Sequence, residues 1–358
     1  MDAVYEKLRE RLDKFPQGFP ATKSGTEIKI LEKLFSPEEA DIALHLRPEY
    51  EKPDVVAERM GKDEKQVADI LYSMSRKGLI ERKREPDGEA LYKLHPWIIG
   101  IYEFRQNDMT AQDFEMYTRY NLEGLLPYWK GSPVSLMRVL PVETEIADTR
   151  RVQPYERVSE FLKKNSRFAV TDCVCRKGQK ITGHACGKTI EICLAAGTWA
   201  DYGIENGWAR EITREEAGEL LRKAEEEGLV HNCSNDTGEN VFICNCCGCC
   251  CGPMRVINFG INTKFTASNY RAVKDQDTCT VCLTCVDRCQ VHAIKQVDER
   301  TVINQDLCIG CGLCVSTCPS GSLNLVKKPE EELPPVYASE LEWRQAWGRE
   351  KARAYPFN

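Results

Sequence analysis

The sequence has no long uninterrupted run of apolar residues. None approaches the roughly 20 that a membrane-spanning helix needs, so a membrane span is not expected. The N-terminus, residues 1–10, is charged and lacks the apolar core of a secretory signal. The sequence therefore predicts a cytoplasmic protein. In that compartment cysteines stay reduced, and metal binding is the role that we expect for them.

Two nucleotide-binding motifs are also missing. The chain contains neither a phosphate-binding loop nor a dinucleotide-binding glycine fingerprint. A flavin or nicotinamide site is therefore expected on a partner subunit. The formal net charge of −6 argues against nonspecific nucleic-acid binding by the whole chain. The five histidines are scattered, and His184, close to Cys186, is expected to be structural rather than a ligand.

Cysteine, in contrast, is abundant. The 358 residues include 19 cysteines, in a chain too long to be a small disulfide scaffold. Eight of them form two runs with the same spacing. A [4Fe–4S] cube offers four iron corners, and three cysteines at x2 intervals on one loop can hold three of them. A zinc site built from CxxC pairs would leave the third cysteine unused. The runs are Cys279-x2-Cys282-x2-Cys285-x3-Cys289 and Cys308-x2-Cys311-x2-Cys314-x3-Cys318-Pro319.

Residues 275–326 resemble a bacterial-type two-[4Fe–4S] ferredoxin. In that family the fourth cysteine of each run binds the cluster of the other run. One departure is Gln290, which stands where the family usually has a proline after the fourth cysteine. The resemblance implies two [4Fe–4S] clusters, one held by Cys279, Cys282, Cys285 and Cys318, the other by Cys308, Cys311, Cys314 and Cys289.

A second set of eleven cysteines lies upstream of these runs. Six of them fall within the eight residues 244–251, a density that indicates a soft metal. Neighbours in an extended segment point to opposite sides, so this run could serve a cluster on each side. Cys233 alone reads as an inert buried thiol. One or two further iron–sulfur clusters are expected, with candidate ligands Cys173, Cys175, Cys186, Cys193, Cys244, Cys246, Cys247, Cys249, Cys250 and Cys251.

The N-terminal part, residues 1–94, reads as helices followed by a hairpin. A capping box at 36–39 and a cap at Asp63 each begin a helix, and Pro86-Asp87-Gly88 separates two strands. This order resembles a winged helix-turn-helix. Residues 52–94 carry ten Lys or Arg against nine Asp or Glu, and the one basic cluster is at 82–84. A groove-reading surface needs a clearer positive excess, so a docking role is favoured over DNA binding.

The whole chain is predicted to be an α+β multidomain protein. A winged-helix-like domain (1–94) precedes a helical connecting region (95–165) and a cysteine-rich α/β iron–sulfur domain (166–255). A ferredoxin module (256–326) and an extended tail (327–358) follow. Trp343 and Trp347 in the tail either anchor a partner or fold back on this chain.

The order of these parts resembles that of iron–sulfur proteins of anaerobes, and Cys246-Cys247-Gly248 is similar to a motif of heterodisulfide-reductase-type proteins. We therefore predict an iron–sulfur electron-transfer protein, a subunit or partner of an anaerobic oxidoreductase, with no catalytic residue assigned. One alternative is a redox-sensing DNA-binding regulator. The other is an iron–sulfur enzyme with an open iron site in the central domain.

Overall fold

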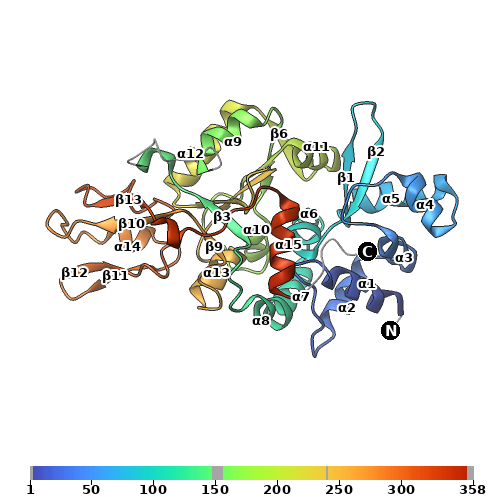
Figure 1. The fold of residues 1–358 in the computed structure, drawn as a ribbon, viewed down its shortest axis with the longest axis horizontal. Coiled ribbons are helices and arrows are strands. Elements are labelled where there is room, and N and C mark those ends of the chain that lie inside the picture. Colours follow the sequence, from blue (N-terminus) through green and yellow to red (C-terminus); the bar gives the residue numbers. More distant parts are fainter. Residues whose placement is uncertain (1–2, 147–155, 239–240, 353–358) are drawn as a thin grey trace.

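The computed structural model describes residues 3–146, 156–238 and 241–352. The N-terminal helices lie at one end of the molecule, a large sheet occupies the middle, and the part that carries the two regular cysteine runs lies at the other end (Figure 1). Among the described residues, no helix has the length and apolar character needed to cross a bilayer.

The N-terminal part consists of helices and one hairpin. Ser36 and Glu39 form the reciprocal capping box expected from the sequence, and Asp63 accepts a hydrogen bond from the Gln66 amide at the start of α5. Gly61 ends α4 in the left-handed conformation. The elements are α1 (Ala3–Asp13), α2 (Thr26–Leu34), α3 (Pro37–His45), α4 (Pro53–Met60), α5 (Glu64–Arg76), β1 (Ile80–Arg84) and β2 (Ala90–Leu94).

The hairpin packs against α11 (Gly197–Asn206) of the central part (Figure 1). Arg82 is 2% exposed and its guanidinium lies 2.7 Å from Glu205. Arg84 lies 2.8 Å from the same carboxylate. The Tyr202 hydroxyl is 2.8 Å from carbonyl oxygens at the end of α5 and the start of β1. The basic cluster noted in the sequence is therefore engaged within the chain.

The central sheet has seven strands in the order β6-β4-β5-β8-β7-β3-β9. Neighbouring strands are antiparallel except β3 and β9, which are parallel. The region expected to be a helical connection contributes β3, and residues expected to begin the ferredoxin module contribute β9. The strands are β3 (Met137–Leu140), β4 (Phe168–Asp172), β5 (Glu191–Ala196), β6 (Ala209–Ile212), β7 (Val230–Ser234), β8 (Phe242–Cys246) and β9 (Thr266–Ala267).

Helices cover both faces of this sheet. On one face Val170 and Leu194 pack with α9 (Val158–Lys164) and α12 (Arg214–Glu226), which Thr213 caps. On the other face Ala169 and Ala195 pack with α11. Because side chains alternate along a strand, Cys193 shares the face of Ala195. The same face receives α10 (Val174–Ile181) and α13 (Gly252–Asn258) at the ends of the cysteine-bearing strands.

Short helices of residues 102–129 join the N-terminal part to this face. Phe114 packs on α10 so closely that a Cβ at Gly178 would lie 2.0 Å from the Phe114 ring. The absence of a side chain at Gly178 therefore allows the two helices to touch. The joining helices are α6 (Tyr102–Phe104), α7 (Ala111–Tyr120) and α8 (Leu126–Trp129).

The C-terminal part begins with two small antiparallel strand pairs and ends with a helix that returns to the middle of the molecule (Figure 1). In the last helix Trp343 is 3% exposed and Trp347 is fully buried, and the Trp343 indole donates to the Ser135 carbonyl at 3.1 Å. Both tryptophans thus pack on this chain. The elements are β10 (Tyr270–Lys274), α14 (Thr284–Arg288), β11 (Ile294–Val297), β12 (Arg300–Ile303), β13 (Leu323–Lys327) and α15 (Glu340–Glu350).

Candidate metal centres

The eight cysteines of the two regular runs surround two small cavities. One cavity, of about 10 Å³, is lined by what we term the first quartet, and the other, of about 20 Å³, by the second quartet. Each quartet combines three cysteines of one run with the fourth of the other, the crossed grouping expected from the sequence. The first quartet is Cys279, Cys282, Cys285 and Cys318, and the second is Cys308, Cys311, Cys314 and Cys289.

Backbone geometry holds the loops of these runs around their cavities. Gly310 has φ of +66°, and a Cβ there would lie 2.0 Å from the Tyr270 carbonyl oxygen. A side chain at this position is excluded both by conformation and by space. The Cys289 sulfur accepts a hydrogen bond of 3.1 Å from the Ala293 amide. Burial raises the pKa of Cys318, but hydrogen bonds from Ser322 and Ser320 outweigh it and lower that pKa to about 6.

Six of the other cysteines form a closed ring in the central part, and we call them the cysteine ring. Each sulfur interacts with two others, and Cys193, Cys244 and Cys246 come from neighbouring strands β5 and β8. Four of the six are buried and two, Cys175 and Cys244, are half-buried, a donor set suited to a soft metal centre. In order around the ring they are Cys173, Cys193, Cys244, Cys246, Cys251 and Cys175.

Arg176 lies beside the ring and is 2% exposed. Its guanidinium donates to the carbonyls of Thr189 and Asn245 at 2.8 Å and to the Cys247 sulfur at 3.8 Å. Among the described residues it has no carboxylate partner. A buried cation needs compensating negative charge. Hydrogen bonds from neighbouring thiols, together with Arg176, lower the pKa of Cys193. The pKa values of the other five ring cysteines are raised, so the thiolate that Arg176 stabilises is that of Cys193.

Four further cysteines converge on the opposite face of the sheet, and we call them the cysteine tetrad. Their sulfurs all lie within 4.8 Å of one another. They pack against Ile192 of β5 and Ala224 of α12. The dense run therefore divides: Cys244, Cys246 and Cys251 join the ring, and the remaining three join the tetrad. The tetrad consists of Cys186, Cys247, Cys249 and Cys250.

Cys233 belongs to neither group. It is fully buried, and the Arg138 guanidinium lies 3.4 Å from its sulfur. Burial raises the pKa of Cys233, which keeps it a neutral thiol. This environment is that of the inert buried cysteine expected from the sequence.

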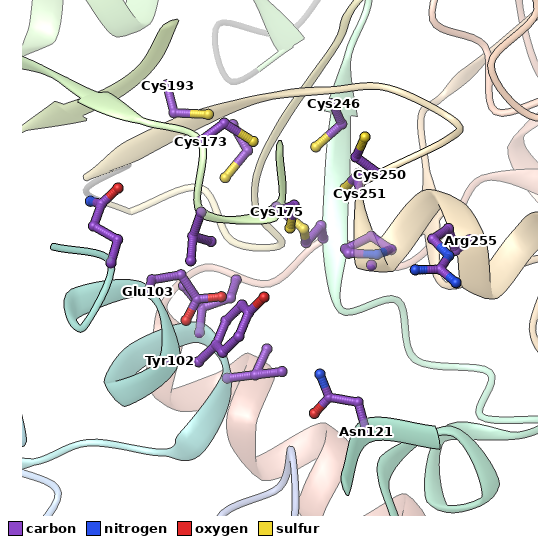
Figure 2. A pocket seen from close by; sticks show the side chains of 18 of the residues that line it. Tyr102, Glu103, Asn121, Cys173, Cys175, Cys193, Cys246, Cys250, Cys251 and Arg255 are labelled. Atoms are coloured by element: carbon purple, nitrogen blue, oxygen red, sulfur yellow. The ribbon is translucent and has the colours of Figure 1, made fainter. Parts of the chain in front are cut away.

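A cavity of about 180 Å³ adjoins the cysteine ring. Figure 2 shows labelled ring cysteines along its upper side and Tyr102, Glu103 and Asn121 along its lower side. Apolar and aromatic side chains make up most of the rest of the wall, including Trp199 and Phe242. This cavity is many times larger than the two quartet cavities of about 10 and 20 Å³.

Glu103 has the carboxyl group in this cavity that is best suited to donate a proton. Its carboxylate accepts a hydrogen bond of 2.7 Å from the Gly100 amide. Burial raises the pKa of Glu103 to about 8, so the carboxyl group carries a proton at neutral pH. Glu103 is not among the site residues predicted from the sequence. A signal existed, since Glu103 is the one charged residue in the apolar segment 97–104.

A polar junction connects the second quartet to the turn that carries ring and tetrad cysteines. The Gln290 side-chain carbonyl accepts from the Gly248 amide at 2.8 Å. Asn258 donates to the Gly248 carbonyl at 3.2 Å and to the Gln290 carbonyl at 3.0 Å. Proline at position 290 could not supply this side-chain acceptor. The departure from the ferredoxin pattern at Gln290 thus has a structural reason.

The comparisons with known proteins bear on one part of the chain. The model of a 4Fe-4S binding domain matches residues 301–324, which include all four cysteines of the second run. A search of curated proteins finds no match. The matched residues carry β12 and most of the second quartet. The C-terminal part of this chain therefore contains a ferredoxin-type iron–sulfur binding module.

Proposed function

We propose that this protein is an iron–sulfur electron-transfer component that passes single electrons between an external redox protein and a metal centre held by the cysteine ring. The observation that carries the proposal is the row formed by three cysteine groups. Cysteines of both quartets pack in one apolar cluster, and Gln290, which follows Cys289, hydrogen-bonds with Gly248 between the ring ligands Cys246 and Cys251.

The two ends of this row differ in exposure. Cys282 of the first quartet is exposed, whereas the ring cysteines are buried or half-buried. When bound, iron–sulfur clusters supply one-electron redox chemistry whose potential depends on burial and on hydrogen bonds to sulfur. The chain provides the thiolates, the Ser322 hydroxyl 3.3 Å from Cys318, and the amide bonded to Cys289. An external partner would therefore exchange electrons at the first quartet.

Iron and sulfide quantitation on anaerobically purified protein tests the proposal. Three clusters of four irons predict about twelve irons per chain. Cys173→Ser and Cys175→Ser, which alter the ring, should remove about four irons and leave the two ferredoxin-type EPR signals. A wild-type content of about eight irons would contradict a cluster at the ring.

The partner is expected to be an anaerobic oxidoreductase subunit that binds flavin or nicotinamide, since no nucleotide-binding motif is present in this sequence. Reduction of the purified protein by such a subunit, followed by EPR of the ferredoxin signals, checks this partnership. Failure of low-potential flavoprotein donors to reduce any signal that dithionite reduces would speak against it.

A second candidate function is a reductase whose substrate binds beside the ring. The specific observation is the size of the adjoining cavity, since cavities of about 10 and 20 Å³ correspond to the two quartets and this one measures about 180 Å³. Its apolar wall and protonated Glu103 suit a small apolar molecule with one hydrogen-bond acceptor, such as a carbonyl oxygen. Reduction by two electrons takes up two protons, one from the Glu103 carboxyl and one from water.

EPR on the reduced protein distinguishes the two candidates. Acetophenone, an apolar carbonyl compound, should shift the signal of the ring centre and leave both ferredoxin signals unchanged if the cavity binds substrate. Glu103→Gln should retain the signal and weaken the response to acetophenone. Unchanged spectra at millimolar acetophenone would rule out the reductase and favour the electron-transfer function.

DNA binding is the least supported function. Of the basic residues on the hairpin strands, Arg82 and Arg84 face Glu205 within the chain. Lys83 lies 3.1 Å from Glu85, and Lys93 lies 3.1 Å from Glu81. A phosphate-binding surface needs free cations. A gel-shift assay with promoter DNA at low salt should show no complex, and a complex with steep salt dependence would revive the regulator hypothesis.

A further inference from the structure

The cysteine tetrad differs from the other cysteine groups in how closely its sulfurs approach one another. All four lie within 4.8 Å of one another, and the sulfurs of Cys249 and Cys250 are 3.7 Å apart. Among the described residues, neither quartet nor the ring brings three of its sulfurs within that distance of one another. The sulfurs of the tetrad therefore lie closer together than those of the quartets and the ring, to which we assign clusters.

The spacing decides between a single ion and a cluster. Four Zn–S bonds of about 2.3 Å in a tetrahedron separate neighbouring sulfurs by about 3.8 Å. Thiolates on a cubane bind four separate irons and must lie farther apart, because the irons themselves are separated. The 3.7 Å between Cys249 and Cys250 fits one tetrahedral ion. It is also far longer than the roughly 2.05 Å of a disulfide bond.

We propose that Cys186, Cys247, Cys249 and Cys250 bind one structural zinc ion. Four thiolates fill a tetrahedral coordination sphere, which is the closed form of zinc site that stabilises folds rather than catalyses reactions. The Arg176 guanidinium, 3.8 Å from the Cys247 sulfur, offsets part of the negative charge of the four thiolates. This inference does not depend on whether the cysteine ring holds an iron–sulfur cluster.

The position of the tetrad in the fold indicates that the ion would link two segments of the chain. Cys186 lies in the loop between α10 and β5, and the other three ligands lie in the turn between β8 and α13. Arg176 links Thr189, at the end of this loop, to Asn245 and Cys247, whereas Gly183 to Ala185 and Gly187 beside Cys186 are exposed. A zinc ion would tie this loop to the turn that also carries Cys251 of the ring.

Metal analysis of the full-length, anaerobically purified protein tests the proposal. The wild type should contain about one zinc per chain, as expected for a single four-thiolate site. Cys186→Ser and, separately, Cys249→Ser should lose most of that zinc while iron and sulfide stay at the wild-type level. Cys233→Ser is the matched control, because this buried thiol belongs to no group and its replacement should leave zinc unchanged.

Replacement of the zinc by cobalt adds a readout that does not depend on stability. Cobalt(II) in the zinc-depleted protein should give the ligand-field absorption of a tetrahedral four-thiolate site, and Cys249→Ser should alter that spectrum. Wild-type protein without zinc, or iron in the tetrad in its place, would overturn the proposal. Loss of about four irons in Cys186→Ser would also overturn it, because the tetrad would then hold a cluster.

Discussion

The junction between the ferredoxin-type module and the cysteine ring can be tested by adding one methyl group, in Gly248→Ala. A Cβ at this position would lie 2.2 Å from the Gln290 carbonyl oxygen. That oxygen belongs to the backbone beside Cys289, so it cannot rotate away as a side chain would. The two segments must therefore separate by more than 1 Å to reach ordinary van der Waals distance.

The expected energetic effect follows from the contacts. Overpacking of this kind costs about 1–3 kcal/mol. Separation also weakens the bonds that Asn258 and Gln290 make across the junction, each worth about 1 kcal/mol. We expect Gly248→Ala to lower the free energy of unfolding by about 2–4 kcal/mol. It should also weaken the magnetic interaction between the second-quartet and ring centres in EPR spectra of the reduced protein.

Gly252→Ala provides the matched control four residues away. A Cβ at Gly252 would meet nothing within 4 Å, and its backbone is not in the left-handed region. The control should unfold like the wild type and show the same EPR interaction. If Gly248→Ala and Gly252→Ala behave alike in calorimetry and in EPR, the junction does not couple the two parts as described.

Three further outcomes are expected. Cys318→Ser should perturb the same EPR signal as Cys282→Ser, and a match with Cys311→Ser instead would refute the crossed grouping. Burial raises the pKa of Glu103 from 4.5 to about 8, so unfolding free energy should fall as pH rises through this window, by at most about 1.4 kcal/mol per unit. Glu103→Gln should remove this pH dependence of the unfolding free energy in chemical denaturation. An unchanged pH profile in the variant would show that Glu103 does not cause it. Arg176→Leu removes a cation beside the ring and should lower the midpoint potential of its centre in an EPR-monitored redox titration; a higher potential would contradict this.

Local features of the fold could be predicted from the sequence because their causes are local. The capping box at Ser36, the cap at Asp63 and the C-cap at Gly61 each depend on a few neighbouring residues, and the structure shows all three. The crossed quartets are not local, and they were predictable because the resemblance to two-cluster ferredoxins implies them. Ligation itself remains a prediction.

Long-range features were beyond a reading of the sequence. Strand β3 lies in a segment with no clear alternation, and its partners β7 and β9 are far along the chain. The division of residues 244–251 between ring and tetrad depends on Cys186 and Cys193, which reach the run from opposite faces of the sheet. The fate of Trp343 and Trp347 was undecided because burial of a helix depends on the surface that it meets.

The interleaving of ring and tetrad ligands in one short segment bears on how the protein matures. Residues 244–251 supply Cys244, Cys246 and Cys251 to the ring and three of the four sulfurs of the tetrad. A metal taken up by either group fixes backbone that also bears ligands of the other. If both groups bind metal as proposed, we expect their loading to be interdependent, because a failure at one site would leave the shared segment unfixed for the other.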